Sequence, residues 1–210
     1  MFNPAAFAIN NKQLGEDIAW YRADPCSCYD PATNYDQQEG CTACESGYIY
    51  RRQFEDQDLR AIVTEVRREY MHADFGFLQV GDIILQTIAE ELRPGMWDRI
   101  ELLDREEEQV ARCDFGVRDT LTNAGTVTQI ISITDATTEY VPYRDFEVDL
   151  QTNTVEWLPG GETPTKVYVV RFRQHPRYFY VGSDVSGARP TQLSSGLSPV
   201  IGKLVRERGG

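Results

Sequence analysis

The sequence predicts a mainly β protein: a β-barrel or sandwich-like domain with a compact four-cysteine module and extended terminal arms. Three observations support this fold class. From residue 75 onward, short apolar and aromatic runs are separated by turn residues at intervals of roughly 8–12 residues, a spacing typical of all-β domains. Apolar residues make up 41% of the 210-residue chain, including eleven Tyr and nine Phe, which is typical of a globular protein. Four of the five cysteines lie between residues 26 and 44.

These observations divide the chain into four expected parts: an N-terminal arm over 1–23, the cysteine module over 24–50, a β-barrel-like domain over 51–182, and a C-terminal tail over 183–210. In the arm, Leu14, Ile18 and Tyr21 are spaced to share one side of a short helix. The tail is rich in Ser, Gly and Pro, yet it keeps enough apolar residues to lie against a partner.

Strands are expected wherever β-branched and aromatic residues gather between turn signals. The expected strands are residues 48–50, 61–66, 77–80, 83–88, 98–103, 110–117, 126–134, 140–150, 154–158, 166–173 and 177–181. Pro159-Gly160-Gly161 separates two of these runs and predicts a hairpin between 155–158 and 167–170. The charge run Asp104 to Glu108 is expected to be a solvated hairpin tip.

The cysteines form a C-x-C pair, Cys26 and Cys28, and a C-x-x-C pair, Cys41 and Cys44, separated by twelve mostly polar residues. Two thiolates close in sequence can face one ion only if the backbone turns sharply, and the glycines that frame the second pair permit such a turn. The intervening loop has too few apolar residues to bury a core, so metal binding would supply its folding energy, on the order of 10 kcal/mol at neutral pH. The pattern predicts one ion held by all four cysteines, zinc by default and iron as the alternative.

Disulfides and a redox-active pair are the competing interpretations. Four cysteines allow three disulfide pairings, although Cys26 and Cys28 are too close in sequence for an easy mutual bridge. Met1 to Pro4 do not form a basic segment followed by an apolar run, so we expect no secretory signal, which weighs against a disulfide-rich secreted domain. The fifth cysteine, Cys113, lies in a strand-like run and is expected to be a small buried side chain.

Charge and composition argue against several classes of function. The chain has 33 acidic and 21 basic residues, a net charge of −12, which disfavours tight binding to phosphate backbones, because Lys and Arg must displace counterions there. No apolar run approaches the roughly 20 residues that a membrane-spanning helix needs. His72 and His175 stand in contexts typical of structural or surface residues. The sequence has neither a nucleophile elbow nor a glycine-rich phosphate loop, so we expect no enzymatic activity and no catalytic residues.

Several segments carry a resemblance to a known group of proteins. They are Asp24-Pro25-Cys26-x-Cys28, Gly40-Cys41-x-x-Cys44-x-x-Gly47-Tyr48-Ile49, Phe77 to Asp82, Pro94-Gly95-x-x-Asp98-Arg99-Ile100, Tyr143 to Trp157, Val167 to Phe172 and Pro176 to Tyr180. Together they resemble virion proteins of tailed bacteriophages, specifically the β-barrel proteins of the neck in the stopper or head-completion group. The resemblance covers most of residues 24–182. It implies a ring of identical copies below the portal and adaptor, which helps to close the DNA channel after packaging and offers a docking face to the tail.

We therefore expect a structural virion protein of the neck or tail, assembled in the host cytoplasm. Its expected partners are copies of itself, the portal or adaptor, and tail-terminator or tail-tube proteins, with packaged DNA passing nearby without specific binding and with no membrane. Another virion position, such as baseplate wedge or tail terminator, is the nearest alternative. From other classes, the alternatives are a cytosolic zinc-ribbon regulator that binds nucleic acid or protein, and a redox enzyme that uses Cys41 and Cys44.

Overall fold

The computed structural model describes residues 4–29, 41, 44–45, 47–54, 59–65, 81–88, 94–121, 125–183 and 199–206. In these ranges the chain is mostly β, with antiparallel sheets and a single helix, which confirms the predicted fold class. The chain divides into two compact units. We call residues 1–104 with 177–208 the barrel unit, and residues 105–176 the inserted unit.

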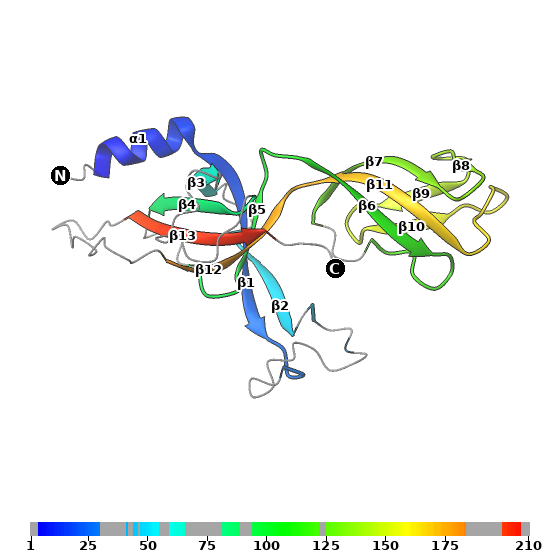
Figure 1. The fold of residues 1–210 in the computed structure, drawn as a ribbon, viewed down its shortest axis with the longest axis horizontal. Helices are drawn as coiled ribbons and strands as arrows, with labels where there is room; N and C mark the ends of the chain where they lie inside the picture. Colours follow the sequence, from blue (N-terminus) through cyan, green and yellow to red (C-terminus); the bar gives the residue numbers. More distant parts are fainter. Residues whose placement is uncertain are drawn as a thin grey trace. The chain divides into compact units, whose positions relative to one another are not determined.

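The barrel unit is built from segments at both ends of the chain. Its elements are α1 (Pro4–Leu14), β1 (Glu16–Pro25), β2 (Tyr48–Gln53), β3 (Leu59–Glu65), β4 (Ile83–Ile88), β5 (Arg99–Leu102), β12 (Arg177–Ser183) and β13 (Pro199–Arg206). Antiparallel pairing runs β1-β3-β4-β13-β12-β5, and β5 pairs back with β1, so that six strands form a closed ring (Figure 1). Closure leaves these six strands without an exposed sheet edge over the paired residues.

The core of the barrel unit follows the period of two that a pleated strand imposes. Alternate residues of five strands face inward: Ile18, Trp20, Leu59, Ala61, Ile83, Leu85, Ile100, Leu102, Tyr178 and Tyr180. The residues between them, such as Arg99 and Glu101 of β5, therefore lie on the outer side of the barrel. Among the described residues, no helix has the length and apolar character needed to cross a lipid bilayer.

Both ends of the chain contribute barrel strands, which corrects the expected arm over 1–23 and tail over 183–210. The helix expected from Leu14 to Tyr21 is wrong: α1 ends at Leu14, and β1 begins at Glu16. Ile18 and Trp20 face the core two residues apart, and pairing with β3 and β5 stabilises the extended conformation. At the other end, β13 pairs with β12 and β4.

The β-barrel-like domain expected over 51–182 is corrected in the same way, because residues 105–176 form a unit of their own. The strand expected over 77–80 lies outside the described residues. The expected strands over 48–50, 61–66, 83–88 and 98–103 correspond to β2, β3, β4 and β5.

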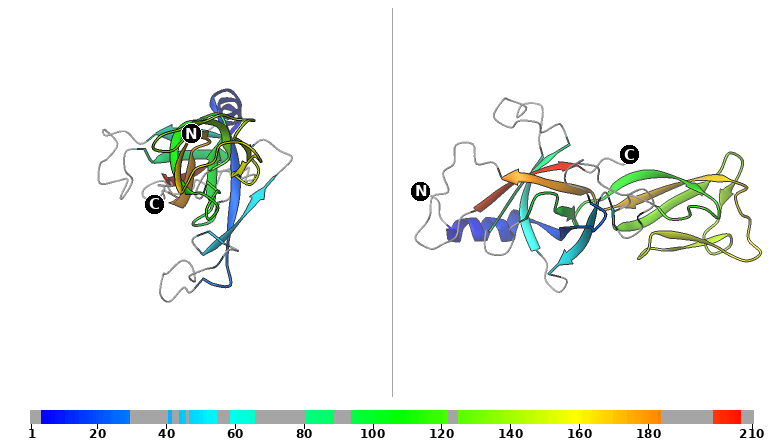
Figure 2. Two further views of the ribbon diagram at one scale, coloured as in Figure 1. Left: turned by 90° about the vertical axis from the view of Figure 1, so that its right-hand side faces the viewer. Right: turned by 90° about the horizontal axis from the view of Figure 1, so that it is seen from below.

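The first half of β1 belongs to the barrel, and its second half extends beyond the barrel. Residues Trp20 to Pro25 of β1 pair with β2. The two strands extend from the barrel side by side as a hairpin (Figures 1 and 2). The cysteines lie at the far end of this β1–β2 hairpin, because Cys26 directly follows β1 and Cys44 lies four residues before Tyr48, the first residue of β2.

The inserted unit has a four-stranded sheet and a separate hairpin. Its elements are β6 (Glu107–Asp114), β7 (Val127–Thr134), β8 (Glu139–Tyr140), β9 (Phe146–Asp149), β10 (Thr154–Trp157) and β11 (Val167–Gln174). The sheet order is β6-β11-β7-β8, and β9 pairs with β10. Trp157 is partly buried, packs against the core of the unit and makes edge-to-face contacts with the rings of Phe115, Tyr140, Phe146 and Tyr168.

Three expectations for this unit are corrected. The hairpin expected between 155–158 and 167–170 is wrong, because β10 pairs with β9, whereas β11 lies between β6 and β7. The strand expected over 140–150 is split into β8 and β9 by a turn in which Tyr143 has a φ of 62°. The charge run 104–108 is not a hairpin tip but leads into β6, where the Glu108 carboxylate accepts a hydrogen bond from the Arg171 side chain of β11.

Candidate metal centre

A first turn positions the C-x-C pair at the end of the β1–β2 hairpin. The N–H of Cys26 donates to the Gly47 carbonyl at 2.8 Å, which joins the two ends of the hairpin. The N–H of Tyr29 donates to the Cys26 carbonyl at 3.0 Å and closes a four-residue turn. This turn directs Cys28 back toward the second pair.

A second turn positions the C-x-x-C pair. Glu45 and Tyr48 exchange two backbone hydrogen bonds, at 2.9 and 3.0 Å, across a tight loop. Gly47 in this loop has a φ of 81°, in the left-handed region that residues with a Cβ rarely adopt. The glycine expected from the sequence to permit a sharp turn does so here, and the turn holds Cys44 against the first pair.

The four thiols converge on one point. The Sγ atoms of Cys26, Cys28, Cys41 and Cys44 all lie within 4.8 Å of one another. The Cys28–Cys44 separation is 3.3 Å and the Cys41–Cys44 separation is 3.6 Å. Four thiolates at about 2.3 Å from a tetrahedral ion are about 3.8 Å apart. The donor set and its spacing therefore fit a single thiolate-bound metal ion, and all four cysteines are free of disulfides.

Contacts among the thiols shift their pKa values in opposite directions. The backbone N–H and the thiol of Cys28 hydrogen-bond to Cys26 and lower the pKa of the Cys26 thiol to about 7. Burial and hydrogen bonds to the neighbouring thiols raise the pKa of Cys44 to about 12. Without a cation between them, one thiolate therefore makes deprotonation of a neighbouring thiol harder. A bound divalent ion would favour the thiolate form of all four cysteines, so its binding would release protons from the cluster.

Two buried arginines of the barrel tie down the turn next to the cluster. The Nη2 of Arg99 lies 3.0 Å from one carboxylate oxygen of Glu45, and the Nη2 of Arg177 lies 3.7 Å from the other. Each arginine side chain is only 6% exposed. The guanidinium of Arg99 also stacks over the Tyr50 ring, 3.8 Å from its centroid. A buried guanidinium without a carboxylate partner would be strongly destabilising, so the contacts with Glu45 hold the cysteine turn against the barrel.

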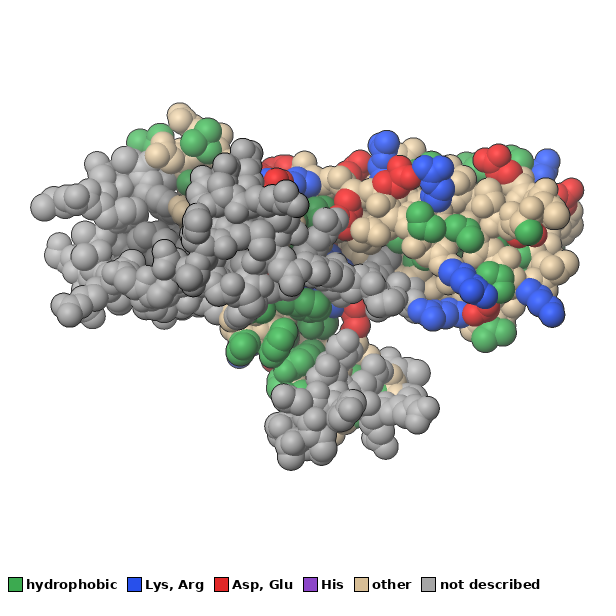
Figure 3. Space-filling view, in the orientation of Figure 1, with side chains coloured by type: hydrophobic (Ala, Val, Ile, Leu, Met, Phe, Trp, Pro, Cys, Tyr) green, Lys and Arg blue, Asp and Glu red, His purple; other side chains and the backbone are tan. Residues whose placement is uncertain are grey.

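Aromatic side chains continue from the cluster to the barrel along the same face. Tyr29 and Tyr48 are in ring contact beside the cysteines, with centroids 5.2 Å apart. Tyr50, two residues further along β2, contacts Phe179 of β12, which in turn contacts Trp97. Figure 3 shows apolar side chains gathered over the β1–β2 hairpin in this view.

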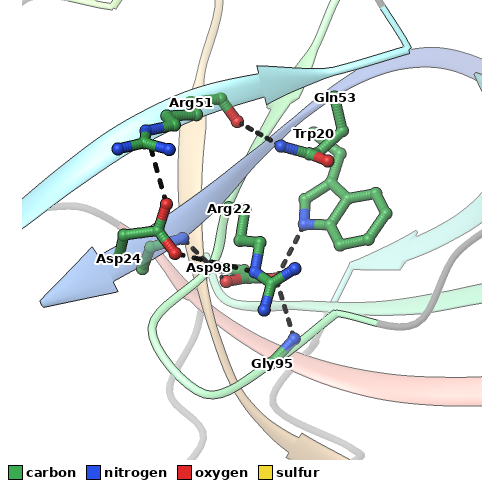
Figure 4. A network of polar contacts seen from close by, with 8 residues as sticks. Trp20, Arg22, Asp24, Arg51, Gln53, Gly95 and Asp98 are labelled. Carbon is green, nitrogen blue, oxygen red and sulfur yellow. Dashed lines mark hydrogen bonds and ion pairs between the residues drawn. The ribbon is translucent and has the colours of Figure 1, made fainter.

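A buried carboxylate fixes the point where the hairpin leaves the barrel. Asp98, only 3% exposed, accepts hydrogen bonds from the Trp20 indole N–H (2.8 Å), the Ala23 N–H (2.9 Å) and the Gly95 N–H (2.8 Å) (Figure 4). Trp20 and Ala23 both belong to β1. Asp98 therefore joins the hairpin strand to the turn that precedes β5.

The structure brings together all four cysteines that the sequence singles out. Cys113 is buried in the inserted unit, as expected. His175 contacts the Arg105 carbonyl through its Nδ1 at 2.9 Å, and His72 lies outside the described residues. The residues that support the cluster were not identified from the sequence. Asp98 could have been found from its spacing, because a Gly followed three residues later by Asp is typical of a turn in which the carboxylate accepts a hydrogen bond from the backbone of that turn.

No protein-family model matches the sequence, and a search of curated proteins finds no significant match. The four-cysteine cluster and its supports therefore carry the functional argument.

Proposed function

We propose that this chain is a non-enzymatic structural protein of a tailed-phage virion, which forms a ring in the neck between portal or adaptor and tail. The observation that carries the proposal is the β1–β2 hairpin, a projecting element with the four-cysteine cluster at its tip. Ion pairs between Glu45 of the cysteine turn and two buried arginines of the barrel hold it, and Asp98 holds it at its base. Such an element keeps its shape when it is pressed against a neighbouring subunit.

The metal in this proposal is zinc. Four thiolates in a closed tetrahedral arrangement leave no open coordination position for a substrate, which is typical of a structural zinc site rather than a catalytic one. Zinc has no redox chemistry of its own, so its contribution would be to fold the loop between the two pairs. Iron remains the alternative ion for the same donor set.

The charge of the chain suits a component of a DNA channel. With a net charge of −12, the protein repels the phosphate backbone and does not retain DNA by counterion release. A neck ring must let DNA pass without binding it. The same charge argues against the alternative of a nucleic-acid-binding regulator.

Metal analysis tests the first half of the proposal. We expect about one zinc per chain in the purified protein. Cys28→Ser and Cys44→Ser should lose the metal, whereas Cys113→Ser, which alters the buried cysteine outside the cluster, should keep it. A folded wild-type protein without metal would overturn the assignment.

Location in the particle tests the second half. Antibody labelling of intact virions should mark the junction between head and tail, and native mass spectrometry should detect a closed ring of identical copies. Label at the far end of the tail would favour a baseplate position, which is the nearest alternative. Absence of the protein from particles would overturn the structural role.

A redox function is the second candidate, because the lowered pKa of Cys26 and the 3.3 Å Cys28–Cys44 separation are also features of reactive thiols. It predicts rapid alkylation of one cysteine in the metal-free protein and a disulfide that forms and is reduced reversibly. The structural proposal predicts instead that zinc protects all four thiols from alkylation to the same extent.

A further inference from the structure

Among the residues that the structure describes, two sheet edges of the inserted unit have no neighbouring strand along part of their length. β7 pairs with β11 on one side, but on its other side β8 pairs with it only at Ile133 and Thr134. β9 pairs with β10 on one side, and its other edge is bridged at Phe146 by Pro142. Over the part of the chain that the structure describes, residues 129–132 of β7 and 147–149 of β9 have no strand beside these edges.

Both edges border one groove of about 500 Å³, a volume within the usual range of ligand sites. It is lined by Gln129, Ile130, Ile131, Ser132, Glu139, Tyr140, Pro142, Tyr143, Phe146, Glu147, Val148 and Leu150. The lining thus combines backbone at a sheet edge with apolar side chains on the floor and walls.

Apolar side chains around the groove are held out toward solvent. Ile131 is 37% exposed, Leu150 44% and Tyr143 85%. Ile131 is the extra residue of a β-bulge, since Arg171 of β11 pairs with Ser132 and the next residue of β11 pairs with Ile130. Tyr143 adopts a left-handed φ of 62°, which is costly for an aromatic residue. Exposed apolar groups gathered at one place are typical of an interaction site.

The acidic side chains of the groove and the sheet edge beside it indicate what kind of molecule would bind there. The charged side chains lining the groove are Glu139 and Glu147, and the described residues that border it include no Lys or Arg. Nucleic acid is therefore disfavoured, and a second copy that docked its own groove edge to edge would bring like charges together. Over residues 129–132, where no described strand lies beside this edge of β7, backbone N–H and C=O groups would be satisfied best by another extended backbone.

We propose that this groove binds an extended segment of a partner protein, which adds to the β7 edge as a further strand. Apolar side chains of the segment would fill the groove, and a Lys or Arg between them would lie near Glu139 or Glu147. The proposal depends on neither the metal centre nor the position of the protein in a virion, so each can fail without the other.

Selection from a library of random peptides about twelve residues long, enough for a strand of typical length, tests the proposal on the full-length protein. We expect enriched peptides to alternate apolar residues with Lys or Arg. In the presence of such a peptide, amide exchange should slow at residues 129–132. Failure to enrich any peptide, or enrichment of peptides that leave these amides unprotected, would overturn the proposal.

Variants of the groove sharpen the test. Ile131→Lys should weaken binding of an enriched peptide at least about tenfold, and Glu139→Gln with Glu147→Gln should reduce both affinity and its dependence on salt. Tyr143→Gly, which relieves the left-handed φ and removes an exposed ring, should also weaken binding without risk to folding. Val117→Lys, at an 88% exposed position outside the groove, is the matched control and should leave binding unchanged. Concentration-dependent self-association abolished by Ile131→Lys would show that a second copy occupies the groove, which contradicts the proposed partner.

Discussion

Replacement of Asp98 by Asn should loosen the base of the β1–β2 hairpin. One carboxylate oxygen accepts from both the Trp20 indole and the Gly95 N–H, and the other accepts from the Ala23 N–H. All three groups are donors. An Asn amide can direct its oxygen to only one side, so its NH₂ must face at least one of them.

The cost follows from this geometry. In the better orientation, the amide oxygen keeps Trp20 and Gly95, and the NH₂ opposes the Ala23 N–H. One charge-assisted hydrogen bond is lost and the other two become neutral. A hydrogen bond to a charged group contributes about 1.5–3 kcal/mol and a neutral one about 1 kcal/mol. The lost bond and the two weakened bonds therefore amount to about 2.5–7 kcal/mol, and we expect Asp98→Asn to lower the free energy of unfolding of the barrel unit by at least about 2.5 kcal/mol.

Asp24 is the matched control, because it is a carboxylate of the same hairpin whose side chain is 36% exposed; Figure 4 shows it beside Arg22 and Arg51. Its ion pairs with Arg22 and Arg51, at 3.7 and 3.4 Å, join side chains that are about two-thirds exposed on the arginine side. Exposed pairs contribute about 0–1 kcal/mol, so Asp24→Asn should change stability by less than about 1 kcal/mol.

Hydrogen exchange followed by mass spectrometry measures the change in local stability in each variant, with the inserted unit as an internal reference. With zinc kept saturating, exchange in β1 and β5 should accelerate in Asp98→Asn, and exchange in β11 of the inserted unit should not change. Equal exchange in the Asp98 and Asp24 variants would refute the view that this carboxylate joins the hairpin to the barrel.

Three further predictions concern the cysteine turn and the inserted unit. Glu45→Gln should destabilise the barrel unit by about 1–3 kcal/mol in thermal unfolding, since two buried guanidinium groups lose a charged partner that is itself partly exposed; Glu106→Gln, in an exposed ion pair, should have little effect. Gly47→Ala should cost about 1–2 kcal/mol of left-handed strain and weaken zinc binding in a chelator competition, and unaltered affinity would contradict the role of this turn. The Tyr140 hydroxyl and two backbone N–H groups lower the pKa of Asp135 to about 2, so its stabilisation is fully present above pH 4 and is lost as pH falls toward 2; urea midpoints should decline more steeply there for wild type than for Asp135→Asn.

The cluster itself could be predicted from sequence because its signal is local. Cys26 and Cys28, and likewise Cys41 and Cys44, are close enough along the chain for one turn each to orient them, and the glycine at position 47 marks the second turn. Its supports could not be found in the same way. Glu45 meets Arg99 and Arg177 across more than 50 and 130 residues of chain, and only strand pairing brings them together.

The main errors in the predicted fold have a related cause. The run Leu14 to Tyr21 fits one side of a helix and also, through Ile18 and Trp20, one face of a strand. Only the long-range partners β3 and β5 decide between them. The Ser, Gly and Pro content after residue 183 similarly concealed the return of β13 to the barrel. Two distant chain ends that complete one sheet leave no local signature in either end.

This arrangement changes which surfaces are available to neighbours. The chain ends were expected to be extended arms, but β1 and β13 are both members of the closed ring of strands. Withdrawing β13 would break two ladders of hydrogen bonds, and withdrawing β1 would break three. The described features that combine exposed apolar side chains with a firm support are instead the β1–β2 hairpin with the turn at Met96 and Trp97 that Asp98 joins to it, and the groove of the inserted unit. Contacts that assemble this protein with others are therefore best sought at these two places, and each can be altered without opening the barrel.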